Sequence, residues 1–376
     1  MIIALFPCSI WMVFLNCVTR SITVLFLLFV AAAGAQEKKE VSNNTLAVRI
    51  ADQEHDFDVV VKKLEDVLWY DKMDDVAYVD KVRLTGPPRF RQIPTGNAFH
   101  DALLDNDLVF HAYVFIPRKA KQNKKYPLVV FSHGGIHGTF STVYAHVIRE
   151  LVAQGYLVVA PDYRGSTGYG KGFYRSIDYG GLENEDVLAA ARYMVENYRM
   201  VDSRRVGLLG WSHGGMITLM NACKYPEVYA CGYAGVPVSD VTYRLEYQKP
   251  GYTDNFTASY HIGKTPQEAP EEYARRSPVN YAKDLRIPLM ITTAENDDDV
   301  SVREVRRMID SLNFYKKDFE YKVYPPMPGA HLFDRIDTRE ATDIRYKAYE
   351  FLARYLTPPR PFRSPDELRK AGYRFN

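Results

Sequence analysis

From Tyr126 onward, short apolar runs alternate with longer stretches in which apolar residues recur at helical spacing. The apolar runs predict strands at 128–131, 157–160, 206–209, 231–234, 289–293 and 321–324. The intervening stretches predict helices at 142–154, 183–198, 213–224, 302–314 and 338–355. This alternation indicates an α/β fold, a mostly parallel sheet covered by helices on both faces. We expect it to form a catalytic domain over 126–358.

The pattern before Tyr126 is less regular. Apolar positions predict a helix at 59–68, followed by strands at 79–84 and 108–116. We interpret 36–125 as a short N-terminal extension packed on the catalytic domain. It is too short for a multi-bladed propeller, because each blade needs about 40 residues or more. The end of the chain, 359–376, is rich in Pro and Arg and is predicted to be a surface tail.

The first 35 residues have the order of a secretory signal. Arg20 precedes an apolar run at 22–33, which ends in the small residues Ala33-Gly34-Ala35. We expect cleavage after Ala35 and a secreted or periplasmic mature protein. A second apolar stretch at 2–18 leaves an uncleaved membrane anchor open as the alternative.

Composition and charge narrow the class of protein. The chain is 47% hydrophobic and 25% charged, a composition typical of a globular protein. Its formal net charge of +2 lacks the basic excess of a nucleic-acid-binding protein. Only Cys223 and Cys231 follow the predicted cleavage site. An oxidising compartment would permit a bridge between them, but we expect two separate buried thiols.

The run Gly210-Trp211-Ser212-His213-Gly214-Gly215 lies between a predicted strand and a predicted helix. Gly-x-Ser-x-Gly in this context is typical of a nucleophile elbow, a tight turn that presents the serine hydroxyl above the sheet. The motif alone is weak, since glycine and serine are common in loops. A catalytic role for Ser212 requires a base, an acid and an oxyanion hole elsewhere in the chain.

Chain order selects the base. In this kind of site the serine is followed by the acid and then the histidine, and only His213, His261 and His331 follow Ser212. His213 lies on the elbow and His261 lacks a strand-end setting, which leaves His331. The acid is expected after the strand at 289–293, where four carboxylates occur. These are Glu295, Asp297, Asp298 and Asp299. The alternative for this acidic run is a solvated loop or a weak Ca²⁺ site.

An oxyanion hole needs backbone N–H donors beside the serine. The His213 N–H is one candidate, and the N–H of Gly134 or Gly135, after the strand at 128–131, is the second. We expect His133 to be a structural loop residue. The glycine-rich loop at 161–170 lacks the spacing of a nucleotide-binding motif, so we predict neither a cofactor nor a metal.

These motifs together resemble the prolyl oligopeptidase family, which includes dipeptidyl and acylaminoacyl peptidases. The likeness covers roughly 126–355 and rests on His133-Gly134-Gly135, the run from Tyr163 to Gly170, the elbow, and the run from Ala234 to Asp240. Its most specific part is Arg-Gly-Ser-Thr-Gly-Tyr-Gly at 164–170. The resemblance implies an α/β-hydrolase fold. It also implies Asp297 as the acid, because family members carry Asp-x-x-Val and only Asp297 stands three before Val300.

The chain departs from the family in two respects. It has no room for the propeller that gates the large members. The residues that would form a substrate pocket are Val238, Val241, Tyr243 and Arg244. Val241 stands where relatives often have Trp, and Arg244 replaces a Tyr.

Three functions follow as hypotheses. The first is an exported serine hydrolase that cleaves peptide or aminoacyl bonds. The second is a carboxylesterase acting on small or carbohydrate-linked acyl esters. The third is a catalytically silent binding protein on a hydrolase fold.

Overall fold

The computed structural model describes residues 43–88, 106–249 and 251–374. The chain divides into two compact units, Met1–Gln53 and Glu54–Asn376. In the first unit the described residues form the start of helix α2 (Asn43–Met73), and the predicted signal at 1–35 lies outside the described residues. No helix within the described ranges has the length and apolar character needed to cross a membrane.

The second unit is built on one eight-stranded sheet in the order β1-β2-β4-β3-β5-β6-β7-β8. The strands are β1 (Ala77–Pro88), β2 (Asp107–Pro117), β3 (Tyr126–Ser132), β4 (Leu157–Asp162), β5 (Val201–Trp211), β6 (Cys231–Gly235), β7 (Leu289–Ala294) and β8 (Phe319–Tyr324). Strands β3 to β8 pair in parallel, whereas β1 and β2 are antiparallel. The predicted α/β-hydrolase-like architecture is therefore confirmed.

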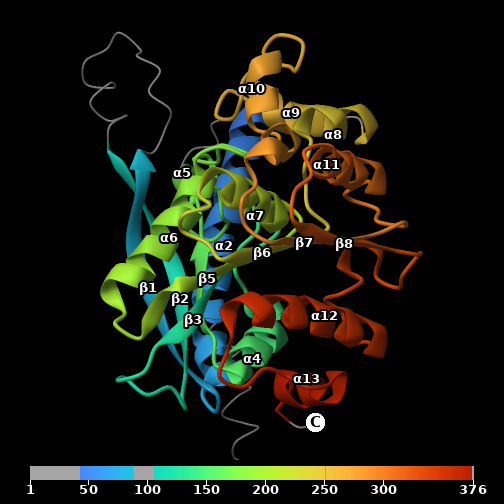
Figure 1. Ribbon diagram of the computed structural model, residues 1–376. Coiled ribbons are helices and arrows are strands. Elements are labelled where there is room, and N and C mark those ends of the chain that lie inside the picture. Colours follow the sequence, from blue (N-terminus) through green and yellow to red (C-terminus); the bar gives the residue numbers. More distant parts are fainter. Residues whose placement is uncertain (1–42, 89–105, 250, 375–376) are drawn as a thin grey trace, which may run out of the picture. The chain divides into compact units, whose positions relative to one another are not determined.

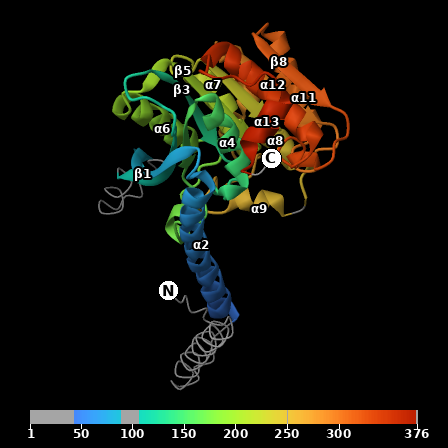
Figure 2. The ribbon, with the colours of Figure 1, turned by 90° about the horizontal axis from the view of Figure 1, so that it is seen from below.

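Helices cover both faces of this sheet, as Figure 1 shows. One face carries α6 (Glu183–Asn197), α7 (His213–Lys224) and α11 (Val302–Phe314). The other carries α4 (Ala145–Gln154), α12 (Arg339–Leu356) and α13 (Pro365–Gly372), which stand in front of the sheet in Figure 2. Each layer encloses its own cluster of buried apolar side chains, because the central strands are apolar on both faces.

Short elements fill the connections. They are η1 (Thr142–Tyr144), α5 (Lys171–Tyr174), α8 (Val241–Tyr247), α9 (Tyr252–Thr257), α10 (Pro270–Arg275), η2 (Pro278–Asp284) and η3 (Ala330–Leu332). Four of them, from α8 to η2, lie between β6 and β7 in a stretch where no helix is expected from the sequence pattern. Each of these four spans only six or seven residues, too few for a clear helical period.

The structure differs from the expected N-terminal extension. Strand β2 pairs with β4 of the main sheet, so the residues before 126 complete the sheet instead of forming a layer upon it. The helix expected at 59–68 is part of α2, which has 31 residues. The sequence pattern predicted only part of this helix, because α2 carries apolar residues on more than one face.

The predicted surface tail is wrong for 365–372. These residues form α13, which begins with Pro365 and is capped by the Ser364 side chain accepting from the Glu367 N–H. Leu368 of α13 is fully buried beside α4. Cys223 and Cys231, in contrast, are free and buried, which confirms the expectation of two separate thiols.

Candidate active site

Ser212 occupies a sharp turn between β5 and α7. Its backbone has φ 59° and ψ −120°, a conformation that a residue with a Cβ rarely adopts and that costs about 1–3 kcal/mol. The Ser212 N–H donates to the Gly235 carbonyl at 3.0 Å, which anchors the turn to the end of β6. A side chain at Gly214 would collide with the Ser132 carbonyl, so β3 and the elbow approach each other closely here. This is the geometry of a nucleophile elbow.

His331 lies on η3 and is held by Asp297 from the loop after β7. Its Nδ1 is 2.9 Å from both carboxylate oxygens of Asp297. The Asp297 carboxylate also accepts the backbone N–H of Asp299 at 3.0 Å and of Val300 at 2.8 Å. These bonds fix the carboxylate, which in turn orients the imidazole with Nε2 directed away from the acid. Such an orientation suits a general base.

The other three carboxylates of the acidic run have different positions. Asp298 accepts the His331 backbone N–H at 3.4 Å. Asp299 pairs with Arg244 at 2.6 Å, and its second oxygen lies 3.7 Å from His331 Nε2. Glu295 pairs on the surface with Arg306. Asp297 is thus the member of the run that contacts Nδ1. No cluster of three metal-binding side chains occurs among the described residues.

The His331 loop is tied to the elbow through the residue before the serine. The Trp211 Nε1–H donates to Asp334 at 2.6 Å, and the Tyr233 hydroxyl donates to the same carboxylate oxygen at 3.0 Å. Arg335 donates to the His331 carbonyl, and its guanidinium lies 5.6 Å from the centre of the Trp211 ring. No pattern in the sequence marks Asp334, because the side chains that tie it to the elbow, Trp211 and Tyr233, are about 100 residues or more away in the chain.

Ser212 and His331 make no direct hydrogen bond within the part of the chain that the structure describes. Hydrogen bonds between nucleophile and base are often long in unliganded enzymes and tighten with substrate. The described structure therefore joins Asp297 to His331 and connects their loop to the elbow.

The loop after β3 places Gly134 beside the serine. A Cβ added at Gly134 would lie 3.5 Å from Ser212 Cβ and 3.3 Å from the Trp211 carbonyl. The Gly134 N–H donates to the Tyr144 hydroxyl at 3.3 Å. Gly135 has φ +77°, which turns the chain away after this close approach. Gly134 and the His213 N–H, at the first residue of α7, flank Ser212. Tyr144 was not singled out from the sequence.

His133 is a structural residue in this geometry. Its Nε2 lies 2.9 Å from Ser166 Oγ, and its Nδ1 lies 3.1 Å from the Tyr163 hydroxyl. The Tyr163 ring stacks on the imidazole, with 4.2 Å between the ring centres. The glycine-rich loop therefore supports the loop that carries Gly134.

Burial makes His133 a source of pH dependence. Desolvation lowers the pKa of His133 to about 4, from an ordinary value of 6.5. The unfolded chain then binds the proton more tightly than the folded protein. Stability is fully present above pH 6.5 and is lost as the pH falls toward 4, by about 3 kcal/mol at most for this group.

We expect the free energy of unfolding, measured with denaturant, to decrease across this pH range. The decrease should be smaller in His133→Gln, which removes the titrating group while retaining a polar side chain. Carboxylates titrate in the same range, so the comparison of the two slopes isolates the histidine. Equal slopes would contradict the assignment.

The side chain of His213 faces a buried carboxylate. His213 Nε2 lies 3.3 Å from Glu183 Oε1 at the start of α6. Burial alone would raise the pKa of Glu183, but the imidazole and the nearby backbone N–H groups outweigh it and hold that pKa at about 2. The Gly181 N–H donates to the same carboxylate at 3.2 Å. The first residue of α7 thus lies beside the start of α6.

The four residues expected to line a substrate pocket do not form an open pocket in the structure. Val238 and Val241 belong to the buried apolar cluster, with Val241 fully buried, so neither offers an open surface to a substrate. Arg244 is also buried, where it donates to the hydroxyls of Tyr247 and Tyr252. Tyr243 is partly exposed and lies against Arg307. The guanidinium is drawn inward because Asp299 and the buried Glu304 offer it partners.

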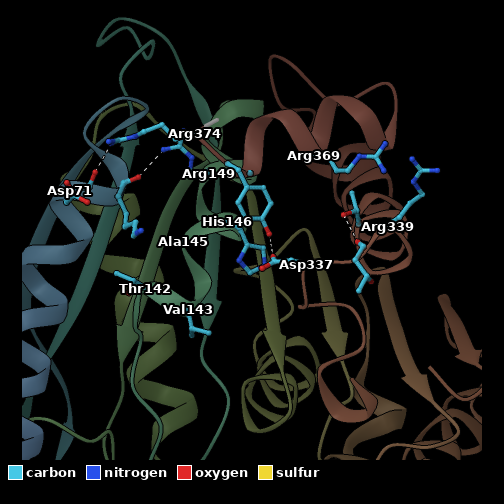
Figure 3. Close-up of a pocket in the computed structure, with 15 residues that line it drawn as sticks. Asp71, Thr142, Val143, Ala145, His146, Arg149, Asp337, Arg339, Arg369 and Arg374 are labelled. Atoms are coloured by element: carbon cyan, nitrogen blue, oxygen red, sulfur yellow. Dashed lines mark hydrogen bonds between the residues drawn. The ribbon is translucent and has the colours of Figure 1, made fainter. Parts of the chain in front are cut away.

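A cavity of about 1010 Å³, shown in Figure 3, lies away from these residues. It is lined by the starts of α4 and α12 and the end of α13, and neither Ser212, Asp297 nor His331 is in its lining. Several of its charged side chains already have partners. Arg149 pairs with Asp75 at 2.6 Å, and Asp337 accepts a hydrogen bond from Tyr373. The cavity is therefore not assigned to the reaction.

Comparison with known proteins gives a consistent result. Residues 142–358 match the Prolyl oligopeptidase family. The chain is 26% identical over 223 residues to Uncharacterized peptidase YuxL of Bacillus subtilis, covering 59% of this chain and 33% of that protein. It is 27% identical over 229 residues to the Acylamino-acid-releasing enzyme of Mus musculus, covering 58% and 30%. The chain thus spans about a third of the length of these curated relatives.

One more relative and one solved structure agree with the family match. Dipeptidyl aminopeptidase BIII of Pseudoxanthomonas mexicana is 27% identical over 269 residues, covering 69% of this chain and 38% of that protein. Among solved structures, the acylaminoacyl peptidase of Pyrococcus horikoshii has a TM-score of 0.62 at 20% identity, over 78% of this chain and 44% of that one. This likeness in structure supports the fold. The match to the family over residues 142–358 covers more than half of the chain and shows the family itself. The chain belongs to the prolyl oligopeptidase family.

Proposed function

We propose that this protein is an exported serine peptidase of the prolyl oligopeptidase type. The observation that carries the proposal is the contact of Asp297 with Nδ1 of His331 at 2.9 Å, on a loop tied to the elbow of Ser212. Serine, acid and histidine occur in the chain order of α/β-hydrolases. The strained backbone of Ser212 supports the same role, since strain of this kind clusters at functional sites.

In the proposed reaction, Ser212 Oγ attacks the carbonyl carbon of the scissile bond while His331 Nε2 takes the hydroxyl proton. Asp297 keeps Nδ1 protonated and stabilises the imidazolium. The N–H groups of His213 and Gly134 hold the developing oxyanion, which replaces the Tyr144 hydroxyl as the acceptor at Gly134. His331 then protonates the leaving amine, and water hydrolyses the acyl-enzyme by the same steps in reverse.

The substrate class is proposed from the relatives and tested directly. Relatives are named for dipeptidyl and acylamino-acid release, but this chain covers only about a third of their length. We expect cleavage of aminoacyl or acylaminoacyl arylamides, with Ser212→Ala as the background control. Turnover of short acyl esters without any cleavage of arylamides would favour a carboxylesterase and overturn the peptidase proposal.

Export is proposed from the first 35 residues. The apolar run at 22–33 and the small residues before Gln36 have the order that signal peptidase recognises. Mass spectrometry of the protein released by the source cells should show a mature N-terminus at Gln36. An intact N-terminus found in a membrane fraction would instead indicate an uncleaved membrane anchor.

A further inference from the structure

From Glu54 onward, helix α2 packs through one face against the described residues of the second unit. Between Glu54 and Met73, its inner face buries Trp69 and Met73 against β2 and buries the Lys62 ammonium against Asp162. The opposite face exposes six large apolar side chains. They are Phe57, Val60, Val61, Leu64, Val67 and Leu68, which we call the α2 stripe.

The α2 stripe has the spacing of a helix–helix contact. Its members stand at positions 57, 60, 61, 64, 67 and 68, so they recur every three or four residues along one side of the helix. Phe57 and Val67 are each about two-thirds exposed, at 67% and 66%. A helix that is apolar on both its inner and outer faces is normally covered on both. Scattered exposed apolar residues are common, but a continuous row of this kind marks an interaction surface.

Charge argues against a lipid surface as the cover. From Glu54 to Met73 the helix has six acidic residues and three lysines, a net charge of −3. Helices that lie on membranes are typically rich in Lys and Arg, because the lipid surface is anionic. A protein partner fits this composition better.

We propose that the partner is a second copy of this chain, whose α2 packs along the α2 stripe. Two identical stripes can pair around a two-fold axis, because each presents the same apolar row to the other. The six side chains of the stripe are 38–67% exposed and together offer on the order of 600 Å² per copy, which reaches the low end of stable interfaces, about 600 Å² per partner. The pairing would be independent of the reaction proposed at Ser212.

The pairing helix also supports the site loops. On the inner face of α2, the Lys62 ammonium donates to the Phe140 carbonyl at 2.8 Å, and the Glu65 carboxylate accepts the Thr142 N–H at 2.6 Å. Both contacts lie in the segment that follows Gly134 and Gly135. Dimerisation through α2 therefore covers a helix that holds this segment in place.

The test is the mass in solution of the mature chain, which begins at Gln36 under the proposed export. Sedimentation velocity across a concentration series should show twice the monomer mass. The double variant Leu64→Glu/Val67→Glu should weaken association at least about 100-fold in Kd, because it places unpaired charges in the apolar contact. Phe314→Glu, at a side chain 78% exposed on α11, is the matched control and should remain dimeric.

Three outcomes would overturn the proposal. One is a wild-type chain that stays monomeric at every concentration, and another is a double variant that dimerises like the wild type. The third is a monomer that binds phosphatidylcholine vesicles through the α2 stripe, which would make this a lipid-facing helix. Circular dichroism reports whether the double variant is folded. If it is not, Leu64→Ser/Val67→Ser makes the same comparison with smaller, neutral side chains.

Discussion

Replacing Asp297 by asparagine is expected to lower kcat about 10⁴-fold, with little change in KM. The amide cannot accept the Nδ1 proton as the carboxylate does at 2.9 Å, and its NH₂ group favours the wrong tautomer of His331. The bonds from the N–H groups of Asp299 and Val300 go to Oδ1, and an amide oxygen can still accept them. The variant should therefore fold normally, and steady-state kinetics on an arylamide substrate measures the loss.

The acidic run supplies its own controls. Glu295→Gln makes the same carboxyl-to-amide change at a residue that pairs with Arg306 on the surface, and it should leave kcat within about twofold. Asp298→Asn alters only an acceptor of the His331 backbone N–H and should cost less than about tenfold. If Asp298→Asn were as damaging as Asp297→Asn, the choice of acid within the run would be wrong.

Lys62→Met is expected to lower the free energy of unfolding by about 3–5 kcal/mol. The Lys62 ammonium lies 2.6 Å from Asp162, and both side chains are essentially inaccessible to water. Burial alone would raise the pKa of Asp162, but Lys62, His133 and the Phe140 N–H together lower it, so the carboxylate is ionised in the folded protein. Without Lys62 this charge stays buried with only neutral hydrogen-bond partners.

A double-mutant cycle separates the energy of the Lys62–Asp162 pair from any effect of the substitution on helix α2 itself. Asp162→Asn in the Lys62→Met background removes the stranded charge and should recover part of the loss. Lys63→Met, the next residue and an exposed one, should change stability by no more than about 0.5 kcal/mol. Denaturant titration of the wild type, Lys62→Met, Asp162→Asn and the double variant gives the four free energies of the cycle. A cost of under about 1 kcal/mol for Lys62→Met, or strict additivity of the two changes, would show that the pair does not fasten α2 to the catalytic unit.

The sequence pattern predicted the central fold well because its signal is local. Strands β3, β4, β6 and β7 and the second half of β5 are buried and largely apolar, as central parallel strands must be. Helices α7 and α11 begin and end at the predicted residues. The pattern failed where burial comes from distant contacts. The helices from α8 to η2 are too short to show a period, and α13 is ordered by packing against α4.

The candidate site shows the same division. Chain order and the family resemblance selected His331 and Asp297, and the structure brings these two side chains into contact. The link from Trp211 to Asp334 spans 123 positions, so no local spacing could reveal it. Val241 was expected in a substrate pocket but is fully buried, because position in a motif does not determine which way a short helix turns its side chains.

The claim that Ser212 is an activated nucleophile is tested most directly by a fluorophosphonate probe, followed by identification of the labelled peptide. The account predicts a single adduct on Ser212. Labelling should disappear in Ser212→Ala and slow strongly in Asp297→Asn, while Glu295→Gln labels at the wild-type rate. A folded wild-type protein that forms no adduct, or that is labelled at another serine, would contradict the proposed function.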